Sequence, residues 1–255
     1  CGLMSLLSIS DLSITYRTAH GEVEAVSGIE FEVKPGEMTA IVGESGSGKS
    51  MTALTIMGLL DERLKPSGTV MLDGADMINS SPRVKRKLRG TKVGMIFQEP
   101  MTALDPLMTV ERQVAEACSL DKARELLKEV GVDRTSSYPH ELSGGQRQRV
   151  LIALAIAGDP DLLICDEPTT ALDVEVQQQI LDLLDSLVRE RGMALLFITH
   201  DLAVVAQVAD DVAVMLRGTI VERGSARQVL HHPEHPYTRT LLDAVPDMRS
   251  EERRV

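Results

Sequence analysis

One run of the chain combines closely spaced glycines with a lysine and a hydroxyl group. Residues 43–50 read Gly-Glu-Ser-Gly-Ser-Gly-Lys-Ser, which fits the pattern G-x-x-x-x-G-K-[ST], and they follow the apolar run Met38–Val42. Glycines in such a run let backbone N–H groups converge on phosphate oxygens at the start of a helix. Lys49 would neutralise β- and γ-phosphates, and the Ser50 hydroxyl would bind Mg²⁺. The residues expected to contact a nucleotide here are Gly43, Glu44, Ser45, Gly46, Ser47, Gly48, Lys49, Ser50 and Met51.

The alternative for this run is a flexible glycine and serine turn. A chance match to the pattern in a chain of this length is on the order of one in a hundred, given ordinary glycine usage. We therefore discard the turn interpretation.

Two carboxylates end a second apolar run. Leu162–Cys165 is followed by Asp166 and Glu167, as expected of a buried parallel strand that delivers acidic groups at its C-terminal end. Asp166 would hold Mg²⁺ through water, and Glu167 would polarise the water that attacks the γ-phosphate. Two acidic residues at a strand end are usually a solvated turn, so this interpretation depends on their pairing with the glycine-rich run.

A second helix start that could bind an anion lies at Leu142–Gln146. Ser143 is placed as the N-cap of the helical run Arg147–Ala157, and Gly144, Gly145 and Gln146 follow it. One nucleotide needs one phosphate cradle, so two cradles in one chain suggest that each completes a site on another subunit. The alternative is a plain N-cap with a glycine hinge.

These residues need elements to position them, and the sequence alternates short β-rich runs with helical ones. The expected strands are Leu7–Tyr16, Val26–Val33, Met38–Val42, Thr69–Leu72, Val93–Phe97, Leu162–Cys165, Ala194–Thr199 and Val212–Leu216. The expected helices run from Ser50 to about Leu60, over Val174–Arg191 and over Leu202–Ala209. From Thr109 to Ala157 the pattern is only helical, with breaks at Gly131 and around Pro139. The pattern predicts an α/β fold with a mostly parallel sheet, an N-terminal antiparallel β subdomain and an inserted α-helical subdomain.

Composition limits the class of protein. The 255 residues are 43% hydrophobic and 25% charged, with three Phe, three Tyr and no Trp, which suits helices layered on a parallel sheet. The net charge of −11 argues against a nucleic-acid backbone as the main partner. The longest apolar run, Val150–Ala157, is too short to span a membrane. Three widely spaced cysteines indicate a reducing compartment and offer no metal cage.

In this order the three motifs resemble the ATP-binding cassette (ABC) family over nearly all of Leu6–Pro246, so the resemblance implies a P-loop NTPase core with ATP and Mg²⁺ as cofactors. It matches Tyr16 to the aromatic residue that stacks on adenine, and Gln98 to the glutamine that senses Mg²⁺ and the γ-phosphate. His200 matches the switch histidine at the γ-phosphate, and Asp173 lies in the loop that crosses the dimer interface. Tyr16 could equally be a core residue, and Gln98 and His200 could be polar strand ends. The metal-binding set is then Ser50, Gln98 and Asp166.

Two further stretches are similar to the oligopeptide, dipeptide and nickel importer branch of that family. They are Gln98–Pro106 and the segment that begins His-Pro-Tyr-Thr-Arg at His235. The interval from Gln98 to Ser143 is short for this branch. The surface on which the helical subdomain docks a permease helix is therefore expected to differ from that of the branch. The histidines His231, His232 and His235 lie in the branch-like segment, so we do not expect them to bind metal.

The resemblance implies a subunit that binds and hydrolyses ATP to energise an importer of peptides or nickel chelates. Its partners would be a second ABC ATPase subunit in a homodimer or heterodimer, two permease subunits at the cytoplasmic face of the inner membrane and, indirectly, a solute-binding protein, with no nucleic acid. The alternatives are a non-transport ABC ATPase acting on nucleic acid or the ribosome, an ABC subunit for another substrate, and a binding module with an inactive site.

For domain organisation we expect one nucleotide-binding domain over residues 4–255. Approximately residues 99–157 would form the helical subdomain, and approximately residues 225–255 the branch-specific C-terminal segment. Met4 is expected to be the natural initiator, so residues 1–3 are set aside as an appended remnant.

Overall fold

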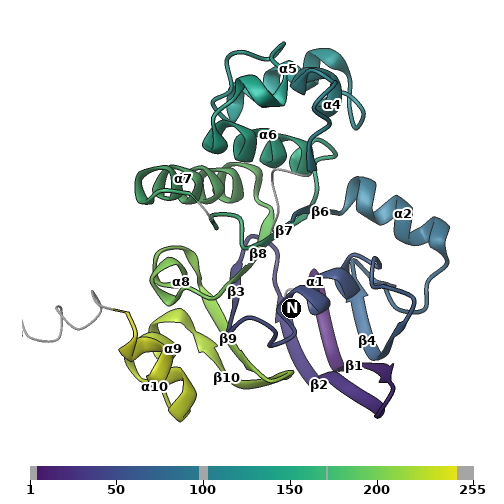
Figure 1. Cartoon of the computed structure of the whole chain (residues 1–255), viewed down its shortest axis with the longest axis vertical. Helices are drawn as coiled ribbons and strands as arrows, with labels where there is room; N and C mark the ends of the chain where they lie inside the picture. The colour runs from purple at the N-terminus through teal and green to yellow at the C-terminus, as the bar shows by residue number, and fades with distance from the viewer. Residues whose placement is uncertain (1–4, 98–102, 171, 246–255) are drawn as a thin grey trace, which may run out of the picture. The chain divides into compact units, whose positions relative to one another are not determined.

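The computed structural model describes residues 5–97, 103–170 and 172–245 (Figure 1). Contacts divide the chain into two units, Cys1–Lys85 with Ala194–Val255, and Arg86–Met193. The first unit contains the phosphate-loop motif, and the second contains the two carboxylates and the Ser-Gly-Gly helix start.

An antiparallel sheet opens the first unit, as predicted. Its strand order is β2-β1-β4-β5, with bounds β1 Leu7–Thr18, β2 Gly21–Val33, β4 Leu64–Leu72 and β5 Ala75–Asp76. The pairing register of β1 shifts between Ile9 and Leu12, where Asp11 has a φ of 51°. A Cβ at Gly68 would lie 2.1 Å from the Asp11 carbonyl oxygen, so only glycine lets β4 follow this bulge.

The second sheet of this unit carries the phosphate-loop motif. β3 (Met38–Val42) lies between β8 (Ala194–Thr199) and β9 (Asp211–Leu216), parallel to both, and β10 (Thr219–Ser225) is antiparallel to β9. Every residue of β3 and β8 is buried, which explains why these parallel strands are apolar except at Thr39 and Thr199. The helices of the unit are α1 Lys49–Ile56, α8 Leu202–Val208, α9 Ala226–His231 and α10 Pro236–Asp243.

The helix expected to reach about Leu60 is shorter than predicted. α1 ends at Ile56, and Gly58 follows with a φ of +62°, a left-handed conformation that does not continue a helix. Apolar residues at Leu59 and Leu60 extended the sequence pattern beyond the point where the backbone turns.

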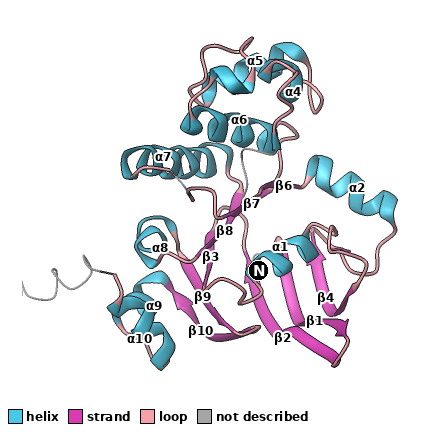
Figure 2. Ribbon diagram, viewed as in Figure 1, coloured by secondary structure: helices cyan, strands magenta, loops and turns pink. Residues whose placement is uncertain are grey.

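The second unit has a parallel strand pair and several helices (Figure 2). The pair is β6 (Val93–Ile96) and β7 (Leu162–Asp166), and α6 (Gly144–Ile156) packs close to β6, since a Cβ at Gly94 would lie 2.1 Å from the Ala155 carbonyl oxygen. The other elements are α4 Val110–Val114, α5 Leu120–Glu129, the short 3₁₀ helix η1 Pro139–Glu141 and α7 Val174–Arg191, while α2 (Pro82–Thr91) spans the boundary in sequence.

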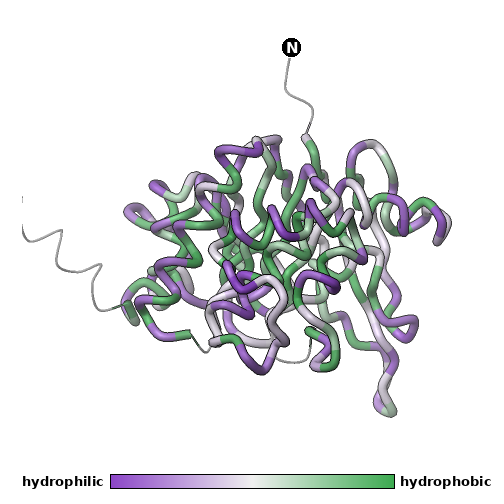
Figure 3. The backbone as a smooth tube through the Cα atoms, turned by 90° about the horizontal axis from the view of Figure 1, so that it is seen from above, coloured by the Kyte–Doolittle hydropathy of each residue, from purple (hydrophilic) through white to green (hydrophobic). Residues whose placement is uncertain are grey.

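The predicted α/β class is confirmed, with an antiparallel N-terminal sheet, parallel central strands and a helical insert at α4–α6. The backbone tube alternates hydrophobic and hydrophilic stretches along the chain, as the strand and helix patterns require (Figure 3). Within the described residues, no helix is both long enough and apolar enough to cross a membrane.

Candidate nucleotide-binding site

The glycine-rich loop connects β3 to α1, where the sequence places it. Gly46 and Gly48 have φ angles of +79° and +103°, which L side chains rarely adopt. A Cβ at Gly46 would meet nothing within 4 Å, so the backbone here faces open space that a phosphate could enter. At Gly48 a Cβ would lie 2.8 Å from both the Met215 and the Val26 side chains. The two glycines therefore serve different purposes: one opens the loop and the other packs it.

The loop is fixed to the sheet at two points. A Cβ at Gly43 would lie 2.1 Å from the Met215 carbonyl oxygen, so the loop begins directly against the backbone of β9. The Gly218 N–H, in the turn between β9 and β10, donates to the Ser47 carbonyl oxygen at 3.0 Å. These contacts hold the loop against β9 near Gly43 and against the β9–β10 turn at Ser47.

Lys49 is the buried cation of the loop. Its side chain is only 5% exposed, and its Nζ donates to the carbonyl oxygens of Gly43 at 2.7 Å and Glu44 at 2.9 Å. Carbonyl oxygens carry only partial charge, so a phosphate bound in the loop would add a full negative charge close to this ammonium.

The start of α1 is suited to anions. Lys49 and Ser50 are its first residues, and its first turn contains no acidic residue. The unpaired N–H groups and the positive end of the helix dipole at this terminus favour a phosphate group. Ser50, the residue after Lys49, and Met51 are both half-buried.

His200 and Tyr16 belong to the same unit as the loop. Val42 is paired with Thr199 across β3 and β8, so His200 follows β8 where the loop follows β3, and its side chain is exposed. Tyr16 is half-buried on β1, two residues beyond Ile14, which is paired with Val26. The Val26 side chain lies 2.8 Å from where a Cβ at Gly48 would be, so β2 passes close to the loop, and β1 is the strand paired with β2.

The two carboxylates stand at the end of β7 in the second unit. Asp166 is 5% exposed and is the last residue of the strand. Glu167 has a φ of +49°, a strained conformation for a non-glycine residue, and its Oε2 accepts from the Thr170 hydroxyl at 2.9 Å. Strain of this kind costs about 1–3 kcal/mol and persists only where the surroundings hold it.

The Ser-Gly-Gly helix start is capped as predicted. The Ser143 Oγ accepts from the Gln146 N–H at 3.2 Å, and the Gln146 side chain accepts from the Ser143 N–H at 3.0 Å. A Cβ at Gly145 would lie 2.6 Å from the Val176 side chain, so the start of α6 packs against the start of α7. Asp173 caps α7 by accepting from the Val176 N–H at 2.9 Å. The second unit thus brings the Ser143 helix start and Asp173 together.

Comparison with protein families decides the identity. Residues 26–170 match the model described as "ABC transporter". The chain belongs to this family. As an ABC cassette it also carries a branch-specific segment, because residues 221–255 match the model "Oligopeptide/dipeptide transporter, C-terminal region".

Individual relatives agree with this assignment. The cassette is 51% identical to the "Peptidoglycan transport ATP-binding protein YejF" of Agrobacterium fabrum, over 94% of this chain and 47% of that protein. It is 46% identical to the "Oligopeptide transport ATP-binding protein OppD" of Bacillus subtilis, over 96% of this chain and 73% of that protein. The chain therefore spans about half the length of the first relative.

A solved structure of similar fold contains the products of ATP hydrolysis. It is the "Dimeric structure of a post-hydrolysis state of the ATP-binding cassette MJ0796 bound to ADP and Pi", with a TM-score of 0.77 and 29% identity, over 87% of this chain and 99% of that chain.

One predicted site residue of the cassette, Gln98, lies outside the described residues. In the described part of the chain, no group of three or more His, Cys, Asp or Glu side chains is arranged so that it could hold a metal ion. His235 instead accepts from the Tyr237 N–H through its Nδ1 at 3.2 Å, capping α10.

Sequence reasoning missed a contact between the C-terminal segment and the phosphate loop. The Glu44 N–H donates to the Tyr237 hydroxyl at 3.1 Å, although the residues are 193 positions apart. In the sequence, the segment that contains Tyr237 was noticed only for its similarity to the importer branch. Nothing in that similarity indicated that the segment contacts the phosphate loop.

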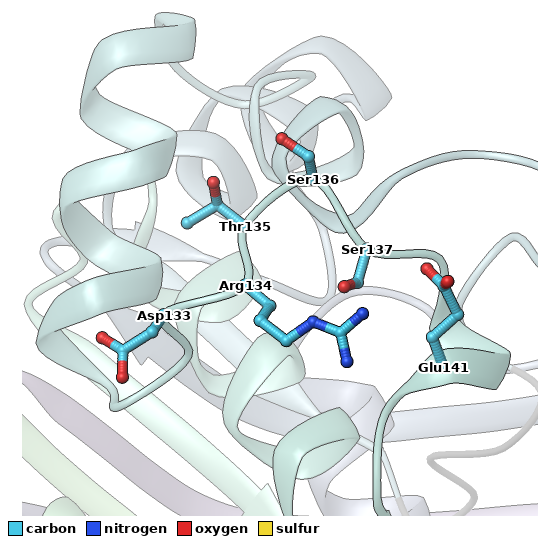
Figure 4. Close-up of a pocket in the computed structure, with 6 residues that line it drawn as sticks. All are labelled: Asp133, Arg134, Thr135, Ser136, Ser137 and Glu141. Carbon is cyan, nitrogen blue, oxygen red and sulfur yellow. The ribbon is translucent and has the colours of Figure 1, made fainter.

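A polar hollow of about 430 Å³ lies elsewhere in the cassette, within the second unit (Figure 4). It is formed by the segment before the Ser143 helix start and is lined by Asp133, Arg134, Thr135, Ser136, Ser137 and Glu141. It includes none of the residues predicted to bind nucleotide.

Replacing Tyr16 by alanine tests whether its ring stacks on adenine. If it does, ATP and ADP affinities should fall similarly, by about 1–3 kcal/mol, the cost of removing one aromatic from a stacked base. Isothermal titration calorimetry with both nucleotides measures this loss. An equal loss of thermal stability without ligand, with unchanged affinities, would instead identify Tyr16 as a core residue.

Proposed function

We propose that this chain is the ATP-binding and ATP-hydrolysing subunit of an ABC importer for peptides. The observation that carries the proposal is the phosphate loop, in which the buried Lys49 ammonium lies on the loop carbonyls beside the open Gly46 backbone. Peptides are favoured as cargo because both the C-terminal family model and the OppD relative are described by oligopeptide transport. Nickel or metal chelates are the second candidate cargo.

The residues present fit a magnesium nucleotide. Ser50, Gln98 and Asp166 offer a hydroxyl, an amide and a buried carboxylate, which are the oxygen ligands that Mg²⁺ prefers. When bound, Mg²⁺ would neutralise charge on the β- and γ-phosphates. Lys49 and the N–H groups at the start of α1 would hold those phosphates, and Tyr16 would stack on the adenine.

Hydrolysis would also need residues outside the phosphate loop. Glu167 would orient the attacking water and accept its proton, and His200 would contact the γ-phosphate. Ser143 and Gly145 would complete the site of a second cassette from the far side of its γ-phosphate, with Asp173 at the dimer interface. ATP would thereby close a head-to-tail dimer, and hydrolysis would reopen it.

The partners of the proposed complex follow from this role. They are two permease subunits, a second ABC subunit that is either a copy of this chain or a related one, and, through the permeases, a solute-binding protein. The cassette would work at the cytoplasmic face of the cell membrane. The net charge of −11 supports a protein partner over nucleic acid.

Nucleotide binding and phosphate release, measured on the purified protein, test the proposal directly. We expect it to bind ATP and ADP in calorimetry and to release phosphate from ATP only with Mg²⁺, so EDTA should abolish turnover and leave ADP binding detectable. Uptake into vesicles that contain the cassette and its permeases then compares peptides with nickel. Turnover stimulated by DNA or ribosomes and not by permeases would favour the non-transport alternative, and absence of nucleotide binding would refute the proposal.

A further inference from the structure

The C-terminal segment of this chain contacts the phosphate loop through one hydroxyl group. Tyr237, the second residue of α10, accepts the Glu44 N–H at 3.1 Å. Glu44 is the first residue after Gly43 in the loop, so the contact lies where the chain leaves β3.

The contact holds one particular peptide group. The carbonyl of Gly43 and the N–H of Glu44 belong to the same peptide unit, and in a trans peptide they point in opposite directions. Lys49 Nζ donates to that carbonyl at 2.7 Å, while the N–H donates to Tyr237. The unit is therefore held from both sides. If Lys49 turns toward a bound phosphate, the Tyr237 contact remains to keep the peptide in place.

Tyr237 is itself well anchored. Its ring packs on the buried cluster that includes Val42, Val205 and Val214. Its own N–H donates to the His235 Nδ1 at 3.2 Å. The Glu222 carboxylate on β10 accepts from the N–H groups of Glu234 at 2.7 Å and His235 at 3.0 Å. These contacts tie the start of α10 to the sheet that carries the loop.

The hydroxyl is in the protonation state that the contact needs. Burial raises the pKa of Tyr237, an effect opposed by the hydrogen bond from the Glu44 backbone. The group therefore stays a neutral phenol at physiological pH, and its oxygen accepts the loop N–H without introducing negative charge beside a phosphate site.

We propose that Tyr237 is a positioning residue that orients the Gly43–Glu44 peptide of the phosphate loop, so that the C-terminal segment raises the affinity of the cassette for nucleotide. The inference rests on the proposed function in one respect, namely that this loop binds ATP and ADP. In this proposal Tyr237 acts through the loop backbone and does not bind the nucleotide itself.

Tyr237→Phe removes the hydroxyl and keeps the ring that packs on the cluster. We expect ATP and ADP to bind roughly two- to tenfold more weakly, the equivalent of one net hydrogen bond. The Glu44 amide should also exchange its hydrogen faster in the ligand-free protein, as resolved by NMR. Tyr138→Phe is the matched control, because Tyr138 lies in the other unit. Removing its hydroxyl should change neither the nucleotide affinity nor the exchange rate of the Glu44 amide.

The outcomes separate this inference from the proposed function. Wild-type protein that binds no nucleotide refutes the proposed function, whereas wild-type binding with unchanged affinity in Tyr237→Phe overturns the positioning role. A lower unfolding temperature without a change in affinity would show that Tyr237 is only structural. Glu222→Gln, which replaces one of the two acceptor oxygens under the segment, should weaken nucleotide binding in the same direction as Tyr237→Phe. Unchanged affinity in that variant would contradict a coupled segment.

Discussion

Glu167→Gln should lower ATP turnover by about 10²- to 10⁴-fold, the usual contribution of a positioned general base, while leaving ATP binding nearly intact. Glutamine keeps the size of the side chain and an oxygen that can accept from the Thr170 hydroxyl, but it cannot take a proton from water. Phosphate release and calorimetric affinity, measured on the same preparation, separate the two effects.

The same variant should also trap a dimer. If the Ser143 helix start of one cassette caps the γ-phosphate of the other, ATP that is not hydrolysed holds two chains together. Size-exclusion chromatography with light scattering should show an ATP-dependent dimer for Glu167→Gln and a monomer with ADP. Adding Ser143→Arg should abolish the dimer, because a bulky cation replaces the small capping hydroxyl beside Gly144 and Gly145.

The Glu167→Gln experiments need a control variant and the correct dimer partner. Glu125→Gln makes the same chemical change at an exposed position on α5 and should behave as wild type. Where the native partner is a related cassette, the dimer is measured with that subunit. Normal turnover in Glu167→Gln, or a dimer indifferent to nucleotide and to Ser143, would refute the composite-site mechanism.

Lys49→Ala should weaken ATP binding by about 10- to 100-fold, since a hydrogen bond to a charged group contributes ~1.5–3 kcal/mol. The ammonium is buried and already directed into the loop by the Gly43 and Glu44 carbonyls, so little conformational entropy remains to be lost on binding. Calorimetry with ATP and ADP measures the change.

Lys49→Gln separates charge from loop support. The glutamine amide can still donate to a loop carbonyl but carries no charge, so it should bind nucleotide almost as weakly as the alanine variant. Lys128→Ala, at an exposed position on α5, is the control for loss of a lysine. ATP affinity unchanged in both Lys49 variants would remove the phosphate-loop assignment.

Where the physical signal is local, the sequence predicts the fold closely. The buried parallel strands Met38–Val42 and Ala194–Thr199 were predicted with the bounds that the structure has, because a strand covered on both faces is apolar at nearly every position. Helix Val174–Arg191 was likewise predicted with its bounds from its helical pattern, and in the structure Asp173 caps its start and the left-handed Gly192 ends it. The residues of the phosphate-loop motif are contiguous in the chain, so its position between β3 and α1 was also predicted from the sequence.

Elements without an apolar pattern were missed. α2 (Pro82–Thr91) has no buried residue and is rich in arginine and lysine, with Val84 and Leu88 as its two large apolar side chains, so it contains no apolar run for the sequence pattern to follow. β10, α9 and α10 are short and partly exposed, and their pairing with β9 and packing beside α8 depend on distant parts of the chain.

For the candidate site, the sequence by itself determined which residue types are available and in what order: the glycines and Lys49, the carboxylates after β7, and the Ser143 cap. Only the tertiary structure decided how the loop is held. It placed the β9 backbone against Gly43, the β9–β10 turn on Ser47, and Tyr237 on Glu44. These are hydrogen bonds and close approaches between residues far apart in the chain, and no local pattern encodes them because either partner alone is compatible with many neighbours.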